Sequence, residues 1–380
     1  MKIVIAPDSF KESMTAEECC NFIKKGLSKV LPEVEYITIP MADGGEGTAS
    51  ALISSTNGEL FSEIVLNPLG KEIKSSFGIL GDKKTAIIEM AKASGLELIS
   101  SSERNPMITT TYGTGQLIKS ALEKNVSTIL IGLGGSATND GGAGMIQALG
   151  GKLLDENNQE IGFGGGELSK LRKIDLSNLD KRLKNVKIIV ACDVENPLTG
   201  INGASYTFGK QKGATDEMIK ILDKNLSHFS KIIEKELNIN VENIPGAGAA
   251  GGLGAGLIGF LSSELKKGID IVIKYSDLES KLKDTDFIIT GEGSIDGQTR
   301  FGKTPFGIAK LGKKYNIPVI ALAGNIGKDI DLLYEYGFTS IFPILTKVET
   351  LDNALKNGGY NIEVVSENIG RLIKSLTKKY

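Results

Sequence analysis

Short β-branched runs alternate with amphipathic helical patterns near the start of the chain. Residues 2–7 (KIVIAP) and 35–40 are expected to form strands, and between them apolar residues recur with a helical period from Thr15 to Leu31. Thr15 and Glu18 have the spacing of a capping box, so Thr15 is expected to cap this helix. A strand, a helix and a second strand in this order predict a parallel sheet.

The same alternation returns near the C-terminal end. The expected strands contain residues 286–293, 318–325 and 339–345, and the expected helices are 305–315, 327–336 and 349–357. We therefore expect a doubly wound α/β domain, Rossmann-like or flavodoxin-like, made from both chain ends. Its expected bounds are residues 1–61 and 285–380.

Between these segments the apolar residues alternate with polar ones. Residues 63–80 and 84–91 are expected to form antiparallel strands, because Asn, Pro and Gly residues interrupt the alternation. A helix at 114–124 and strands in STILIGLGG and KIIVACD follow. Residues 62–284 are therefore expected to form an inserted domain of mixed α/β character. A cleft between two such domains is a common place for an active site, and we expect one there.

Composition narrows the chemistry. The chain has 380 residues, 47 glycines, a formal net charge of -2 and three cysteines, which favours a two-domain protein and excludes a basic nucleic-acid binder or a disulfide framework. The N-terminus resembles neither a signal peptide nor a membrane span, so a cytoplasmic location is expected. The single histidine, His228, lies in a lysine-rich amphipathic pattern and is expected to be solvated. Proton transfer is therefore expected to fall to carboxylates or lysines.

An acid or amide, usually beside glycine, follows nearly every predicted strand. In open α/β sheets, ligands bind outside the carboxyl ends of the strands, and helices that begin there offer N–H groups to anions. A single such loop can be explained by helix capping, but the repetition favours an oxygen-rich site suited to Mg²⁺. The acids and amides are Asp8, Asp43, Asn139, Asp140, Asp193, Glu292, Asp296 and Asn325, and the lysines that could hold phosphate are Lys11, Lys210, Lys212 and Lys303.

Residues 297–304, GQTRFGKT, match the P-loop pattern G-x-x-x-x-G-K-T. The preceding strand is expected to end near Thr290, too far away for a P-loop, and Pro305 is expected at the first position of a helix. We therefore expect a helix N-terminus suited to phosphate but no P-loop fold. Residues 246–251, GAGAAG, match the dinucleotide pattern, yet no convincing strand precedes them, so these glycines are expected to allow close helix packing or ligand contact.

The chain resembles the type I glycerate kinase family in an ordered set of motifs that covers nearly its whole length. The motifs are APDSFKES, PMADGGEGT, GLGGSATNDGG, ACDVENPLTG with FGKQKGA, PGAGAAGGLGAG, TGEGSIDGQTRFGKTPFGIA and AGNIG. One departure is Glu12, where the family usually has glycine. The resemblance implies Mg²⁺- and ATP-dependent phosphorylation of the small molecule D-glycerate, usually at the 2-hydroxyl, in a two-domain fold that is not the P-loop fold.

The inventory of residues fits phosphoryl transfer, which needs cations, backbone N–H groups and a carboxylate rather than histidine. Asp8 and Lys11 share the first strand-end loop, and Lys11 is expected to neutralise the transferring phosphate. Asp43 and Asp193 are expected to serve as general base and metal ligand, in either order. Further candidates are Asp296 for metal; Gly134, Gly135, Ser136, Asn139, Asp140, Ser294 and Lys303 for nucleotide; and Arg104, Arg300 and Ser9 for glycerate.

Other functions remain open at this point. A glycerate 3-kinase would share these motifs, and a Mg²⁺-dependent phosphatase or isomerase could use the same acids. A non-catalytic two-domain protein that binds a small acid and regulates a partner is a third hypothesis. ATP-dependent turnover separates the kinases from the other two.

Overall fold

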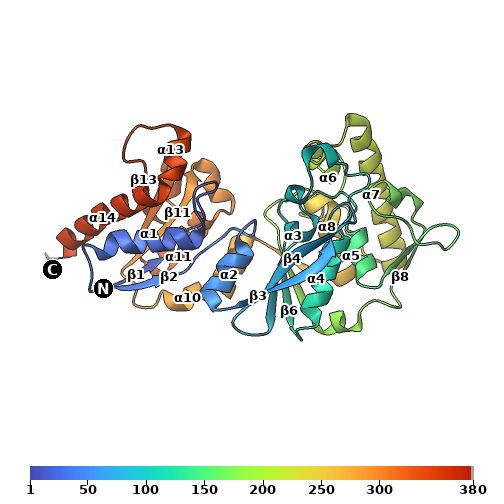
Figure 1. Ribbon diagram of the computed structural model, residues 1–380, viewed down its shortest axis with the longest axis horizontal. Helices are drawn as coiled ribbons and strands as arrows, with labels where there is room; N and C mark the ends of the chain where they lie inside the picture. The colour runs from blue at the N-terminus through green and yellow to red at the C-terminus, as the bar shows by residue number, and fades with distance from the viewer. Residues whose placement is uncertain (378–380) are drawn as a thin grey trace. The chain divides into compact units, whose positions relative to one another are not determined.

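The structure is a computed structural model that describes residues 1–377 (Figure 1). The chain divides into two compact units. The first contains residues 1–43, 50–57 and those from Gly268 onward, and the second contains 44–49 and 58–267. These bounds differ from the expected ones chiefly at the C-terminal end of the second unit, which lies at residue 267 instead of the expected 284. Residues after Gly268 group with the first unit, because Ile269 packs beside Gly307 of a helix in that unit.

The first unit is built on a fully parallel five-stranded sheet in the order β13-β12-β11-β1-β2. Its strands are β1 (Lys2–Ile5), β2 (Glu35–Thr38), β11 (Phe287–Ile295), β12 (Val319–Ile326) and β13 (Phe338–Pro343). Renumbered along the chain, this is the 2-1-3-4-5 order of flavodoxin-like folds. The order reverses between β1 and β11, which makes their carboxyl ends the topological switch point. The predicted doubly wound sheet from both chain ends is confirmed.

Helices from opposite ends of the chain pack together in the first unit. Helix α1 (Ala16–Ser28) lies beside α14 (Gly358–Thr377) (Figure 1), and α1 has the predicted capping box of Thr15 and Glu18. Gly26 allows this contact, because a Cβ there would lie 2.2 Å from the carbonyl oxygen of Glu363. The other helices are α9 (Gly268–Tyr275), α10 (Leu278–Lys281), α11 (Thr304–Tyr315), α12 (Asp331–Tyr334) and α13 (Leu351–Lys356). Helix α2 (Thr48–Thr56) belongs to the first unit from Ser50 onward, and its first two residues are grouped with the second unit.

The second unit has a mixed six-stranded sheet in the order β10-β9-β6-β5-β4-β3. Its strands are β3 (Glu59–Leu66), β4 (Glu72–Ile79), β5 (Thr85–Glu89), β6 (Thr128–Gly132), β9 (Lys187–Ala191) and β10 (Glu264–Lys266), and β7 (Lys152–Leu154) pairs with β8 (Lys173–Asp175) in a small sheet. The predicted antiparallel pairs β3–β4 and β4–β5 are confirmed, and β5, β6, β9 and β10 run parallel.

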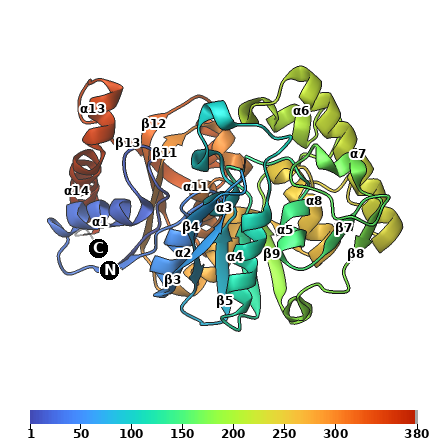
Figure 2. The ribbon, with the colours of Figure 1, turned by 45° about the vertical axis from the view of Figure 1, so that its right-hand side comes forward.

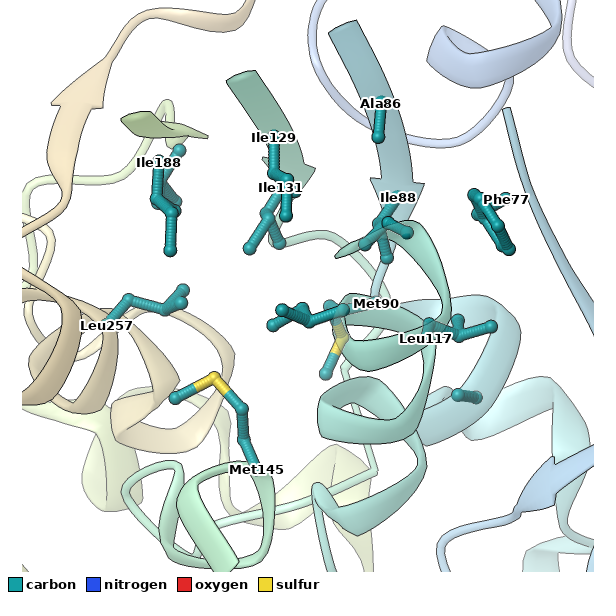
Figure 3. Packing of buried hydrophobic residues seen from close by; sticks show 14 of the residues in the cluster. Phe77, Ala86, Ile88, Met90, Leu117, Ile129, Ile131, Met145, Ile188 and Leu257 are labelled. Atoms are coloured by element: carbon teal, nitrogen blue, oxygen red, sulfur yellow. The ribbon is translucent and has the colours of Figure 1, made fainter. Parts of the chain in front are cut away.

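Helices α4, α5 and α8 cover one face of this sheet (Figure 2). Ile88 and Ile131 on the strands face Leu117 of α4, Met145 of α5 and Leu257 of α8 in one continuous apolar core (Figure 3). The helices are α3 (Ala91–Ser94), α4 (Tyr112–Leu122), α5 (Ala143–Ala148), α6 (Ala204–Phe208), α7 (Asp216–Leu237) and α8 (Ala249–Leu261). Short 3₁₀ helices are Leu96–Leu98, Ser101–Glu103, Glu167–Lys170, Lys181–Asn185, Lys210–Lys212 and Gly297–Phe301. Within residues 1–377, no helix is both long and apolar enough to cross a bilayer.

The glycine-rich start of α8 packs directly on another backbone segment. Gly251 and Gly252 have positive φ angles of 69° and 86°. A Cβ on Gly251 would lie 1.9 Å from the carbonyl oxygen of Thr138, and one on Gly256 would lie 2.3 Å from that of Gly141. Of the two interpretations of GAGAAG, close packing or ligand contact, close packing is confirmed at Gly251.

Glu12 has a left-handed backbone conformation, with φ of 64°, which explains why glycine is suited to this position. Replacing Glu12 by Gly is expected to raise the free energy of unfolding by up to about 1 kcal/mol, because glycine adopts this conformation without steric strain. Thermal denaturation of Glu12→Gly and of Glu12→Ala tests this. The alanine control removes the same exposed carboxylate but keeps the strain, so an equal gain in both variants would contradict the prediction.

Candidate functional site

Polar side chains meet at the switch point of the first unit. The chain beyond β1 continues beside β11, because the amide of Ala6 donates to the carbonyl of Ile289 and that of Asp8 donates to the carbonyl of Gly291. The segment after β2 lies alongside, since the amide of Met41 donates to the carbonyl of Pro7. Asp8, Asp43 and Glu292 are thereby carried to the same edge of the sheet.

Asp8 is held in a dense set of hydrogen bonds. Its Oδ1 accepts bonds from the amide of Ser9 at 2.6 Å and from the Ser9 hydroxyl at 3.2 Å, and its Oδ2 accepts one from the hydroxyl of Thr304. Burial raises the pKa of Asp8 to about 6, and repulsion from Asp43 adds to the rise, whereas the bonds from Thr304 and Ser9 oppose it. Asp8 is therefore a carboxylate whose protonation changes close to neutral pH.

Glu292 is paired with the lysine of the P-loop-like stretch. Lys303 Nζ lies 2.9 Å from Glu292 Oε1 and donates to the carbonyl of Ser294 at 3.2 Å. Burial raises the pKa of Glu292 to about 7, while the ammonium of Lys303 lowers it and the charges of Asp8 and Asp43 raise it further. Lys303 is also the N-cap residue of α11. A cation, a carboxyl group and the N–H groups of a helix N-terminus are therefore gathered here.

The P-loop-like stretch differs from expectation in two respects. Strand β11 continues to Ile295, so the expectation that it ends near Thr290 is wrong. The strand continues through its glycines because β12 pairs with it in register as far as Ile326. Gly297–Phe301 then form a 3₁₀ helix, and Pro305 is the second residue of α11 rather than the first. The lysine does lie at a helix N-terminus, as expected.

The other predicted residues of the first unit have varied surroundings. Ser294 accepts a hydrogen bond from the Asn325 side chain at 3.3 Å, and Lys11 is exposed. Asp296, predicted as a metal ligand, caps the 3₁₀ helix by accepting from the amide of Gln298 at 2.8 Å. The guanidinium of Arg300 lies 4.9 Å from the ring centre of Phe301, and its buried Nε has no hydrogen-bond partner.

In the second unit, the predicted nucleotide residues lie in one loop between β6 and α5. Asp140 is fully buried there and accepts four hydrogen bonds, from the amide and hydroxyl of Thr111 and from the amides of Gly142 and Gly144, at 2.8 to 3.2 Å. Burial raises the pKa of Asp140, whereas these bonds lower it. Asn139 is also buried and donates to the Ser205 hydroxyl at 3.0 Å. Asp140 therefore organises the loop and is shielded from solvent.

Lys212 contributes a buried ammonium to the same loop. Its Nζ donates to the hydroxyl of Ser136 and to the carbonyl of Thr138, both at 2.8 Å. Burial lowers the pKa of Lys212 to about 7, and Asp140 opposes this by favouring the charged form. The side-chain oxygens of Thr138 and Asn139 are buried without a hydrogen-bond partner.

The remaining candidates of the second unit lie in three different settings. Arg104 donates to the carbonyl of Gln211 at 3.2 Å, and its buried Nε has no partner. Asp193 follows β9 and is exposed. His228, expected to be solvated, is instead half-buried, because its ring packs against the segment before β8 and its Nε2 lies 2.7 Å from the Leu171 carbonyl. Across the residues that the structure describes, no group of three or more histidine, cysteine or acidic residues could hold a metal ion.

Three residues with strong local contacts received no assigned role from the sequence. From the sequence, Glu292 was recognisable only as one strand-end acid among several. Its pairing with Lys303 depends on the 3₁₀ helix Gly297–Phe301, which brings Lys303 back beside β11. Thr304 bonds to Asp8 across 296 residues of sequence. Glu89, at the end of β5, is buried and accepts from the amide of Ala49 at 2.8 Å. Its position near the carboxyl end of an expected strand was the available signal.

A parallel sheet with carboxylates, a lysine and a helix N-terminus at its switch point is an arrangement suited to phosphoryl transfer. Comparison with known proteins identifies the family. Residues 3–374 match the Glycerate kinase family. The chain is 53% identical to the glycerate 2-kinase of Escherichia coli K12, over 97% of both chains, and 52% identical to the glycerate kinase of Bacillus subtilis 168, over 98% of both.

The fold comparison agrees. The structure matches a crystal structure from Salmonella typhimurium LT2, described as that of a glycerate kinase 2, with a TM-score of 0.91 and 46% identity over 99% of both chains. The protein is therefore an enzyme of the kinase class. It belongs to the glycerate kinase family, as the motifs of the sequence indicate.

Proposed function

We propose that this enzyme transfers the γ-phosphoryl group of ATP to the 2-hydroxyl of D-glycerate. The choice of substrate and hydroxyl is supported by the 53% identity to the E. coli protein named glycerate 2-kinase. The chemistry is supported by one feature of the first unit, the meeting of Asp8, Glu292 and Lys303 at the switch point. These groups suit phosphoryl transfer, which requires a base for the hydroxyl proton and cations for the phosphate charge.

Asp8 is the best-placed residue to take the proton from the substrate hydroxyl. A general base works best when its pKa lies near the working pH, and the pKa of Asp8 is raised to about 6. The hydrogen bonds from Ser9 and Thr304 fix the carboxylate without neutralising it. Asp43, whose charge acts on both Asp8 and Glu292, assists as a second carboxylate of the same site.

Lys303 would hold the charge of the transferring phosphate. Its ammonium is held by Glu292 and by the carbonyl of Ser294, at the N-terminus of α11. This position adds the N–H groups of the helix to the lysine charge, and both favour an anion. Lys11, exposed in the loop after β1, is a second cation of the first unit for this role.

A bound Mg²⁺ would neutralise phosphate charge as the bond to the transferred group forms and breaks. The residues of the first unit fit such an ion, because Asp8, Asp43 and Glu292 repel one another and a cation relieves that repulsion. Mg²⁺ in kinases is commonly held by one or two carboxylates together with substrate phosphates and water. Such a site needs no dedicated three-ligand cluster. Asp193 and Asp296 remain further proposed ligands.

We assign the loop of residues 134–142 in the second unit to the nucleotide phosphates. Asp140 fixes the buried part of this loop internally, and Gly134 and Gly135 are its exposed residues, so their backbone is the part of the loop offered to phosphate. Arg104 and Arg300 are proposed for the glycerate carboxylate, since a guanidinium binds a carboxylate through two hydrogen bonds. Each has a buried Nε without a partner, a donor that a carboxylate would satisfy.

An ADP-release assay with Mg²⁺-ATP and D-glycerate tests the proposal, with the product passed to enolase in the absence of phosphoglycerate mutase. We expect ADP release with an immediate enolase signal, because enolase acts on 2-phosphoglycerate. ADP release without that signal would assign the 3-hydroxyl instead. Folded protein that releases no ADP at any glycerate concentration would refute the substrate assignment.

A further inference from the structure

Lys212 has an unusual place in the second unit. It ends the 3₁₀ helix Lys210–Lys212, which Gly213 terminates with φ of 89°. The helix turns its two lysines to opposite sides. Lys210 is exposed and pairs with Asp216 at 2.6 Å, whereas Lys212 is 2% exposed.

The Lys212 ammonium joins two points of the loop that we assign to phosphate. The Ser136 hydroxyl and the Thr138 carbonyl each accept a 2.8 Å hydrogen bond from Nζ. Gly135, Gly141 and Gly142 all have positive φ angles. Glycine adopts such angles readily, but it also adopts many others, so these residues do not by themselves hold the loop in one conformation. A loop with so many glycines needs external contacts to keep one conformation. Asp140 supplies such contacts at one end of the loop, and Lys212 supplies them at the other.

Burying the Lys212 ammonium is unfavourable for the stability of the fold. Taking it out of water costs several kcal/mol, whereas an apolar side chain of similar length would occupy the same volume without that cost. The hydrogen bonds to Ser136 and Thr138 compensate in part, and the opposite charge of Asp140 compensates further. The arrangement therefore specifies the shape of the loop at the expense of stability.

We propose that Lys212 is a positioning residue for phosphoryl transfer: by bonding to Ser136 and Thr138 it holds the 134–142 loop in the shape that receives nucleotide phosphates. The proposal deepens the proposed function and rests on it. Asp140 is the acidic group that acts on the Lys212 ammonium, and the guanidinium of Arg104 donates to the carbonyl of the neighbouring Gln211.

The test compares Lys212→Met with Lys220→Met as a control. Both variants remove a lysine of the second unit, but Lys220 is an exposed residue of α7, and only the first variant removes an ammonium that contacts the loop. Steady-state kinetics are measured for both substrates between pH 6 and 9. We expect Lys212→Met to raise KM for ATP by about tenfold or more, as loss of charged hydrogen bonds predicts, and to leave KM for glycerate within about twofold. Lys220→Met is expected to match the wild type.

The pH profile separates positioning from a purely structural role. Because the pKa of Lys212 is lowered to about 7, the wild-type KM for ATP is expected to rise above pH 7, where the ammonium loses its charge and its hydrogen bonds to Ser136 and Thr138 weaken. Lys212→Met is expected to lack that change. A variant that is destabilised but has an unaltered KM for ATP and an unaltered pH profile would overturn the proposal.

Two further measurements cover the remaining outcomes. If Lys212→Met fails to fold, Ser136→Ala removes one acceptor and keeps the lysine, and unchanged kinetics in that variant would count against the proposal. Amide hydrogen exchange of residues 134–142 needs no turnover. Faster exchange in Lys212→Met, or in Ser136→Ala if the former does not fold, is expected, and unchanged exchange would overturn the inference. Wild-type protein that releases no ADP would instead refute the proposed function, so the two failures are distinguishable.

Discussion

Replacing Asp8 by Asn is expected to lower kcat by about a hundredfold or more, because the amide cannot accept the proton of the substrate hydroxyl. The wild-type rate is expected to rise with pH through about 6, where the pKa of Asp8 lies, as the carboxyl group becomes the carboxylate that acts as base. Asp8→Asn is expected to lack this rise. The measurement is the pH dependence of kcat and kcat/KM in the ADP-release assay for both proteins.

The variant is expected to remain folded. The side-chain oxygen of the new asparagine can still accept a hydrogen bond from the amide of Ser9. The substitution also removes a buried charge. Because the pKa of Asp8 is higher in the folded than in the unfolded protein, Asp8 contributes a loss of stability as the pH rises from about 4 through 6, and the variant lacks that contribution. Asp352→Asn, which changes an exposed carboxylate in the same unit, is the control. Near-normal turnover in Asp8→Asn would remove Asp8 from the catalytic groups.

Replacing Gly251 by Ala is expected to lower the free energy of unfolding of the second unit by about 3 kcal/mol or more. The new Cβ would lie 1.9 Å from the Thr138 carbonyl oxygen. The Cβ is fixed directly to the backbone and the oxygen is a backbone atom, so no side-chain rotation can relieve the overlap. The positive φ of 69° adds strain for any residue with a Cβ. Thermal denaturation and soluble yield measure the effect.

Gly70→Ala is the matched control for this change. Gly70 has a similar φ of 74°, but nothing lies within 4 Å of a Cβ there. Its replacement is expected to cost about 1 kcal/mol, from backbone strain alone. The difference between the two variants therefore isolates the collision of α8 with the Thr138 backbone. Equal melting temperatures would contradict the close approach described here.

Local patterns predict the elements of this protein well, and they fail where distant segments decide the outcome. The capping box at Thr15 and Glu18 acts within one helical turn, so sequence alone could place it. The end of β11 could not be placed, because its last residues stay extended only by pairing with β12. The domain bounds have the same dependence, since the packing of Ile269 beside Gly307 assigns α9 to the first unit.

In the candidate site, too, local patterns predict some features, and contacts between distant segments decide the others. The rule that ligands bind at the carboxyl ends of strands selected Asp8, Asp43 and Lys303 from sequence. The rule could not rank them, because the pKa of Asp8 depends on burial and on Asp43, and neither is visible in a motif. Lys212 was one lysine among several candidates. Only the turn of its 3₁₀ helix distinguishes it from exposed Lys210.

The position of β1 between β2 and β11 in the first sheet sets an order for folding during synthesis. β1 pairs with β11, and the whole of the second unit lies between them in the chain. The ribosome therefore completes residues 58–267 before β11 exists, and a domain made mostly of one continuous segment can fold first. During that interval β1 has an unpaired edge, which is a template for aggregation. Nascent chains that end before Phe287 are thus the species in which a chaperone has most to protect.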